Sequence, residues 1–272
     1  MTNPESSPGG PDARQPAAGG PGFSPAGRAS LGPGGGSSAL TDSSLGRLAG
    51  ALFAPGKTFA SIARRPTWAV AMLVLVVLAS VVGFMAAQRM DFADLIHHRL
   101  AESGQQVPDN IVERQIEMAQ KFGRVFAAGG GVFYAVILLL IALVFWVAFK
   151  LLGSDMDFRA SLSTTLHACM PGAVAQLLSI PVILSRASFG YQDLRTGSFL
   201  TSNLAAFAGP DAKPWLLALL SSFDVFTLWV VALLAIGYRL VARVSATAAT
   251  VTVVVLWLAW VAIRVGWSAI FG

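Results

Sequence analysis

The chain has 272 residues, of which 55% are hydrophobic and 12% are charged, and its formal net charge is +5. An average soluble domain carries about twice that charged fraction, so the composition excludes an ordinary soluble enzyme. The basic residues are scattered and do not alternate with aromatic residues, so we expect no nucleic-acid partner. Cys169 is the only cysteine, which rules out an intrachain disulfide and a zinc site built on cysteines.

Residues 1–42 predict a disordered tail. Ten glycines, seven prolines and six serines fall within residues 1–40. Such a segment buries too little apolar surface to offset the conformational entropy that it would lose on folding. It also has no continuous apolar stretch of the kind that a signal peptide needs.

Residues 43–66 predict a juxtamembrane segment of two short amphipathic helices separated by Pro55. Leu45, Leu48 and Leu52 recur at helical spacing in the first. The second carries Phe59 and Ile62 on one side, and its flanking basic residues are Lys57, Arg64 and Arg65. Such helices beside a membrane span are expected to lie in the bilayer interface; the alternative is an ordinary surface linker.

The stretch from Gly50 to Thr58 superficially matches a phosphate-binding loop. A true loop of this kind has four residues between its glycines, whereas Gly50 and Gly56 are separated by five. One of the five is Pro55, which has no backbone N–H to offer a phosphate. We therefore expect no nucleotide partner, and nothing else in the sequence calls for a cofactor or a resident metal.

Five apolar stretches are long enough to cross a bilayer as helices. They cover about residues 67–87, 126–152, 160–184, 215–240 and 247–271. The predicted fold is therefore an all-α, polytopic membrane domain over residues 67–271. A polar segment at 88–125 predicts two further helices, the second of which continues into the second span. His97 and His98 lie in this segment, but adjacent helical residues point about 100° apart, which disfavours a shared metal.

The third span is the least regular of the five. Pro171 and Pro181 each remove a backbone hydrogen bond and should bend the helix. His167 and Gln176 are its larger polar side chains. They are consistent with hydrogen bonding between helices, or with a path for a substrate or a proton.

The loop charges indicate the orientation in the membrane. Short loops weigh most in the positive-inside rule. With five spans, the loop at 153–159 and the turn at 239–245 lie on the side of the N-terminal segment, and near the spans this side carries the basic residues Lys57, Arg64, Arg65, Lys150, Arg159, Arg239 and Arg243. We therefore expect a protein of the cell membrane with a cytoplasmic N-terminus.

Asp224 and Arg264 are the two formal charges deep within the predicted spans. Asp224 lies 19 residues before Arg243, in the last tight turn, and Arg264 lies 21 residues after it. At about 1.5 Å per residue their depths differ by only about 3 Å, which predicts an intramembrane charge pair. The alternatives are that Arg264 extends toward the surface, and that Asp224 pairs with Arg186 or His167. The pair would lock the last two spans together or serve a proton or cation site.

Two stretches of the sequence resemble one known family. The first runs from Phe53 through Pro55, Thr58 and Ile62 to Trp68, and the second is the stretch from Asp224 to Trp229, followed by Gly237. Together with the polar loop and the proline of the third span, they are similar to bacterial members of the Yip family of Ypt/Rab-interacting membrane proteins. The resemblance covers residues 44–271.

The resemblance implies a five-span helical domain with a cytoplasmic N-terminus and supplies no catalytic residues. Eukaryotic members of the family are associated with vesicle traffic and small GTPases, but their aspartate-leucine-tyrosine-glycine-proline signature is absent from this sequence. The leading hypothesis is a non-enzymatic membrane scaffold or adaptor whose partners are the bilayer and other membrane proteins or further copies of itself. The alternative is a small-solute or ion permease that uses Asp224 and Arg264. An intramembrane enzyme has no motif to support it.

Overall fold

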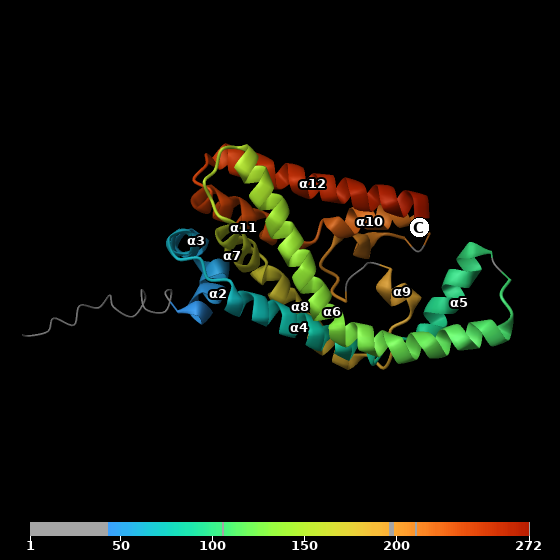
Figure 1. Ribbon diagram of the computed structural model, residues 1–272. Helices are drawn as coiled ribbons and strands as arrows, with labels where there is room; N and C mark the ends of the chain where they lie inside the picture. The colour runs from blue at the N-terminus through green and yellow to red at the C-terminus, as the bar shows by residue number, and fades with distance from the viewer. Residues whose placement is uncertain (1–42, 105, 196–198, 210, 272) are drawn as a thin grey trace, which may run out of the picture. The chain divides into compact units, whose positions relative to one another are not determined.

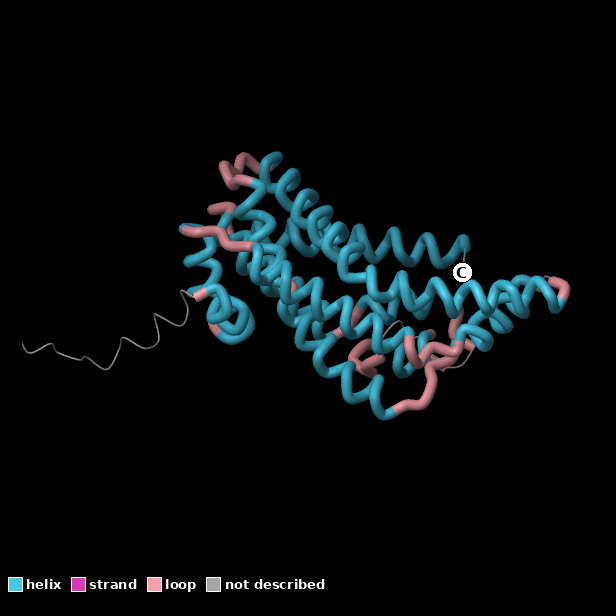
Figure 2. Tube along the Cα trace, turned by 60° about the horizontal axis from the view of Figure 1, so that its bottom comes forward, coloured by secondary structure: helices cyan, strands magenta, loops and turns pink. Residues whose placement is uncertain are grey.

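The computed structural model describes residues 43–104, 106–195, 199–209 and 211–271, and its regular elements in these ranges are helices (Figures 1 and 2). The tail predicted at residues 1–42 lies outside the described residues. In chain order the elements are α2 (Ser44–Phe53), α3 (Pro55–Arg64), α4 (Ala69–Ala87), α5 (Phe92–Ser103), α6 (Asp109–Leu151), α7 (Phe158–Ala168), α8 (Met170–Ser185), α9 (Tyr191–Leu194), the 3-10 helix η1 (Leu204–Phe207), α10 (Pro214–Ser222), α11 (Val225–Val241) and α12 (Ala246–Phe271).

Four helical segments are long and apolar enough to cross a membrane, and α11 is a shorter apolar helix. The four are α4, the Gly129–Leu151 part of α6, the consecutive helices α7 and α8, and α12. The 19 residues of α4 span about 28 Å, close to the thickness of the hydrocarbon core. The all-α, multi-pass membrane architecture predicted from the sequence is confirmed.

Helices α4 and α6 pack closely because glycine allows their backbones to approach. A Cβ atom on Gly131 of α6 would lie 2.1 Å from the hydroxyl oxygen of Ser80 and 2.4 Å from the carbonyl oxygen of Val76. A Cβ on Gly83 of α4 would lie 3.1 Å from the carbonyl oxygen of Ala127. Small residues serve this purpose in membrane helices.

Helix α7 lies at the centre of the bundle. Every residue from Ala160 to Ala168 is buried, and α7 contacts α3, α4, α6 and α11. The helix ends at Cys169, and α8 begins at Met170 with Pro171 in its first turn, where a missing N–H costs little. Pro181 lies within α8. Of the two prolines, Pro171 therefore marks the boundary between two helices.

The fourth span, expected as one helix over 215–240, is interrupted. Helix α10 ends at Ser222 and α11 begins at Val225, while Asp224 has an extended backbone with φ −104° and ψ 141°. The backbone groups that lack a helical hydrogen bond at this break bond to the segment around residues 202–204. Leu204 N–H donates to the carbonyl of Phe223, and Val225 N–H donates to the carbonyl of Ser202. Irregular backbone is tolerated at this depth because protein groups satisfy it.

The α2–α3 hairpin packs on the bundle as part of it. Phe59 and Ile62 of α3 are completely buried, and α3 packs along α11. A Cβ atom on Gly237 of α11 would lie 3.0 Å from the Phe59 ring, so the absence of a side chain there makes room for α3. The apolar side of α3, expected to face the bilayer interface, therefore faces protein.

Candidate functional site

A cluster of hydroxyl groups joins three helices inside the bundle. The hydroxyl oxygen of Tyr238 on α11 lies 2.8 Å from those of Ser161 and Thr165 on α7. The Ser161 hydroxyl also donates to the carbonyl of Ala142 on α6, at 2.7 Å. All three hydroxyl side chains are buried. Because unpaired polar groups are costly in such surroundings, these hydrogen bonds specify how α6, α7 and α11 fit together.

The Tyr238 ring is held by aromatic neighbours from α6. Its centroid lies 4.8 Å from that of Phe145 and 4.7 Å from that of Phe149, in stacked arrangements. The phenol thus has apolar contacts on its ring and a hydrogen-bonded hydroxyl at its tip, the usual arrangement of a buried tyrosine.

A buried arginine ties the N-terminal hairpin to the first span. The side chain of Arg47 on α2 donates through Nη1 to the carbonyl of Arg65, at 2.8 Å, and to the hydroxyl of Thr67, at 3.0 Å. The Ser163 hydroxyl on α7 donates to the carbonyl of Thr67, at 2.9 Å. Among the described residues Arg47 has no carboxylate partner in a salt bridge. Arg47 therefore connects α2 to the segment before α4, and Ser163 connects that segment to α7.

His167 and Gln176, the polar residues expected in the third span, do not lie in one hydrogen-bonded network. The Nδ1 atom of His167 lies 2.8 Å from the carbonyl oxygen of Ser163, one turn earlier in the same helix. The buried side-chain oxygen of Gln176 has no hydrogen-bond partner within the described part of the chain. The two side chains are therefore not hydrogen-bonded to each other.

Asp224 marks the interruption of the fourth span as the N-cap of α11. One carboxylate oxygen accepts hydrogen bonds from the backbone N–H groups of Phe226, at 2.9 Å, and Thr227, at 3.2 Å. The other accepts from the hydroxyl of Ser202. A carboxylate at a helix N-terminus satisfies free N–H groups and interacts favourably with the helix dipole.

Arg264 reaches the same interruption from α12. Its guanidinium donates to the hydroxyls of Ser221, at 2.9 Å, and Ser222, at 3.3 Å. These serines end α10, two and three residues before Asp224. The structure thus brings both predicted charges to one place and gives each its own polar partners. Among the described residues the acid–base side-chain contacts join Asp193 to Arg186 in a salt bridge and Asp94 to the imidazole of His98 at 3.6 Å.

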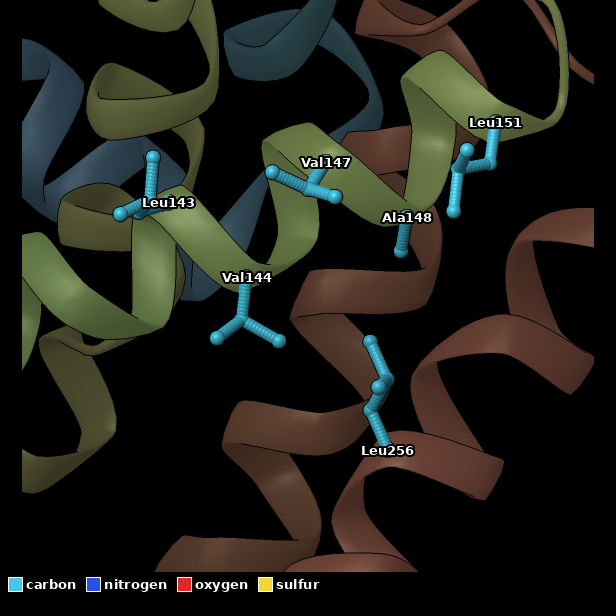
Figure 3. A pocket seen from close by; sticks show the side chains of 6 residues that line it. All are labelled: Leu143, Val144, Val147, Ala148, Leu151 and Leu256. Carbon is cyan, nitrogen blue, oxygen red and sulfur yellow. The ribbon is translucent and has the colours of Figure 1, made fainter.

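An apolar groove of about 380 Å³ lies between α6 and α12 (Figure 3). Figure 3 shows Ala148 of α6 pointing toward Leu256 of α12. All six lining side chains are aliphatic: Leu143, Val144, Val147, Ala148, Leu151 and Leu256. The groove offers no group that could polarise a substrate or hold an ion.

The polar groups of these sites serve to hold helices together by hydrogen bonds. The buried cluster consists of neutral hydroxyls, and the carboxylate of Asp224 is occupied as a helix cap. No three His, Cys, Asp or Glu side chains gather as metal ligands in the described ranges. The arrangement can fix helices in place and restart a helix inside the span.

Sequence reasoning missed Arg47 and Tyr238. The spacing of the leucines in α2 predicts a buried face that contains Leu45. In the structure Leu45 is exposed, and the buried face carries Arg47, Gly50 and Ala51. For Tyr238, the signal was the run of hydroxyl residues from Ser161 to Thr165, which required a polar partner on a neighbouring helix.

The family model described as Yip1 domain matches residues 49–267, which is most of the chain. The matched range begins within α2 and ends within α12, so it includes the buried hydroxyl cluster and the interrupted span. Comparisons with curated proteins and with solved structures gave no match.

Proposed function

Because the chain belongs to the Yip1 domain family, we propose that this multi-pass membrane protein is a bacterial member of the family and a non-enzymatic scaffold or adaptor. The observation that carries the proposal is the use of the buried polar groups. The buried hydroxyl of Tyr238, the Nη1 atom of the buried residue Arg47 and the partly buried carboxylate of Asp224 all bond to other parts of the same chain. A rigid bundle with an attached hairpin suits binding between proteins better than it suits chemistry.

The α2–α3 hairpin is the proposed partner-binding face. Leu45 and Phe53 of α2 are 70% and 81% exposed, although the hairpin is fixed by Arg47 and Phe59. Lys57, Arg64 and Arg65 add exposed positive charge beside them. An ordered apolar pair with a basic rim fits a membrane protein partner, or a second copy of this chain, at the surface of the bilayer.

The orientation that accompanies this proposal places the hairpin at the cytoplasmic surface of the cell membrane. It is supported by the basic residues near the span ends on that side, among them Arg239 in the last turn of α11 and Arg243 in the short turn between α11 and α12. The role would then be to organise proteins at that surface, in keeping with the family's link to trafficking.

Asp224 and Arg264 act in this proposal as a structural lock for the end of the chain. Arg264 joins α12 to the end of α10, and Asp224 joins the start of α11 to Ser202. A permease would instead need Asp224 available to a passing cation, which its three hydrogen-bond donors disfavour.

The proposal is tested by cross-linking full-length protein in native membranes, followed by purification in mild detergent and mass spectrometry. Deleting residues 43–66 would unseat Phe59 from α11, so the better variant is the surface double substitution Leu45→Ser with Phe53→Ser. We expect a reproducible membrane-protein partner that this variant loses and the matched variant Ala49→Ser, at an exposed position of α2, retains.

Recovery of the same proteins with both variants would contradict the assignment of the partner-binding face. Cation uptake by reconstituted protein that Asp224→Asn abolishes would contradict the scaffold itself and support the permease.

A further inference from the structure

Helix α6 is much longer than a membrane span. Its 43 residues extend over about 64 Å, twice the roughly 30 Å of the hydrocarbon core. The part from Gly129 to Leu151 forms the span. Residues 109–128 precede it, on the side of the membrane opposite the α2–α3 hairpin.

This outer half of α6 has three distinct faces. At about 100° per residue, one face carries Val112 and Gly123 and packs on α5; a Cβ atom on Gly123 would lie 2.5 Å from the Phe92 ring. The second face carries the exposed charged residues Glu113, Glu117 and Lys121.

The third face is apolar and exposed. It carries Ile111, Met118, Phe122, Val125 and Phe126 within an arc of about 100° around the helix, and Gln115 is the one polar side chain of residues 109–126 in that arc. Val125 is 67% exposed and Phe126 is 76% exposed. An apolar strip of this size on a helix needs a covering partner.

The strip continues without a change of face into the membrane-spanning half. Phe133, Val136, Leu140 and Val147 fall within the same arc and are also exposed, and they lie in the part of α6 that spans the bilayer. Lipid covers these residues in a membrane. The exposed strip at 111–126 is thus a direct extension of a lipid-covered surface.

The path of the helix agrees with a lipid partner. Figure 1 shows α6 changing direction along its length, so that its first half does not continue the line of the span. Gly129, Gly130 and Gly131 lie where the span begins, and glycine runs are common sites of helix bending. A helix that turns at the membrane boundary can lie along the bilayer surface.

We propose that residues 109–126 of α6 form an interfacial anchor that lies along the bilayer surface opposite the α2–α3 hairpin, with the apolar strip inserted among the lipids. The outer half carries Asp109, Glu113 and Glu117 against Arg114, Lys121 and Arg124, so its formal charges balance. The anchor therefore inserts through its apolar face and does not require anionic lipid. Together with α5, which packs on it, this part of α6 holds the end of the bundle opposite the α2–α3 hairpin at the membrane surface.

The test uses full-length protein with Cys169→Ala, reconstituted in phosphatidylcholine vesicles and spin-labelled at a single introduced cysteine. Met118→Cys and Phe122→Cys report the apolar strip, and Glu117→Cys is the matched control one residue away on the charged face. The collision rates of each label with oxygen, which partitions into lipid, and with a water-soluble nickel chelate are compared. We expect the ratio of oxygen to nickel collisions to be several-fold higher at Met118→Cys and Phe122→Cys than at Glu117→Cys.

Two results would overturn the anchor. Equal access of the nickel chelate to all three labels would place the outer half of α6 in water. Shielding of the two strip labels from both reagents would show that protein covers the strip. Adding phosphatidylglycerol should leave the ratios unchanged, and a ratio that rises only with anionic lipid would contradict insertion through the apolar face.

Discussion

The two ends of the helical bundle are held together by different forces. Around α3, α7 and α11 the contacts are buried and include a fully hydrogen-bonded hydroxyl cluster. Around α5 and α9 the side-chain ion pairs are exposed: His98 lies 3.6 Å from Asp94 and stacks on Tyr191, and Arg186 contacts Asp193. Buried contacts are worth far more than exposed ion pairs. We therefore expect the buried contacts at the end with α3 to set the stability of the domain and the ion pairs at the end with α5 to contribute little.

The largest effect is expected from Phe59→Ala. This substitution removes a completely buried ring from the contact between α3 and α11 and should lower the free energy of unfolding by about 3–5 kcal/mol. Phe53→Ala, at an exposed position of the same hairpin, is the matched control and should change little. Thermal unfolding in detergent measures both, and equal effects would show that α3 is not held by its buried face.

Arg47→Met comes next. It leaves the carbonyl of Arg65 and the hydroxyl of Thr67 without their donor, which should cost about 1–3 kcal/mol. Arg64→Met removes an exposed charge from the same hairpin and should be close to neutral. Limited proteolysis between α3 and α4 provides the readout, because loss of the Arg47 bonds should expose that segment. Identical cleavage of the two variants would refute the role of Arg47.

Tyr238→Phe tests the hydroxyl cluster without disturbing the stacked ring. The buried hydroxyls of Ser161 and Thr165 lose a partner, so the expected loss is about 1–2 kcal/mol. In a double-mutant cycle with Thr165→Val, the two effects should be less than additive, because both remove the same hydrogen bond. Strict additivity would mean that the two groups do not interact.

Asp224 and Arg264 allow a direct test of how the last helices are joined. Asp224→Ala removes the cap of α11 and should cost about 1–2 kcal/mol. With separate partners, Asp224→Ala and Arg264→Gln should have nearly additive effects on the free energy of unfolding. A large coupling energy between the two substitutions would instead show that Asp224 and Arg264 interact directly, as their similar depth in the membrane predicts.

The smallest effect is expected at the opposite end. His98→Gln breaks an exposed pair with Asp94, so the domain should lose less than about 1 kcal/mol. If His98→Gln lowered the free energy of unfolding as much as Phe59→Ala, the two ends of the bundle would not differ in their contribution to stability.

The spans could be predicted from the sequence because a bilayer imposes a minimum length of apolar residues. The glycines at 129–131 indicate a close contact with some other helix, but only the structure shows that this helix is α4. The break at Asp224 was missed, because hydropathy does not register a single carboxylate that caps a new helix inside an apolar stretch. It also depends on Ser202, from a loop distant in sequence.

The candidate site was only partly predictable for a similar reason. The similar depth of Asp224 and Arg264 in the membrane predicts that they lie in one region. It does not predict that each side chain hydrogen-bonds to a nearby serine hydroxyl, Ser202 for Asp224 and Ser222 for Arg264. The role of Tyr238 depends on contacts between α7 and α11, which lie far apart in the sequence. Such pairings become visible only when the helices are packed.

Photo-cross-linking from the α2–α3 hairpin tests the scaffold proposal most directly. A photoreactive amino acid would replace Phe53 in full-length protein in native membranes, with Val77 on the exposed face of α4 as the matched control. We expect a defined protein adduct from position 53 and lipid adducts from position 77. Lipid adducts alone from both positions would contradict a protein-binding role for the hairpin.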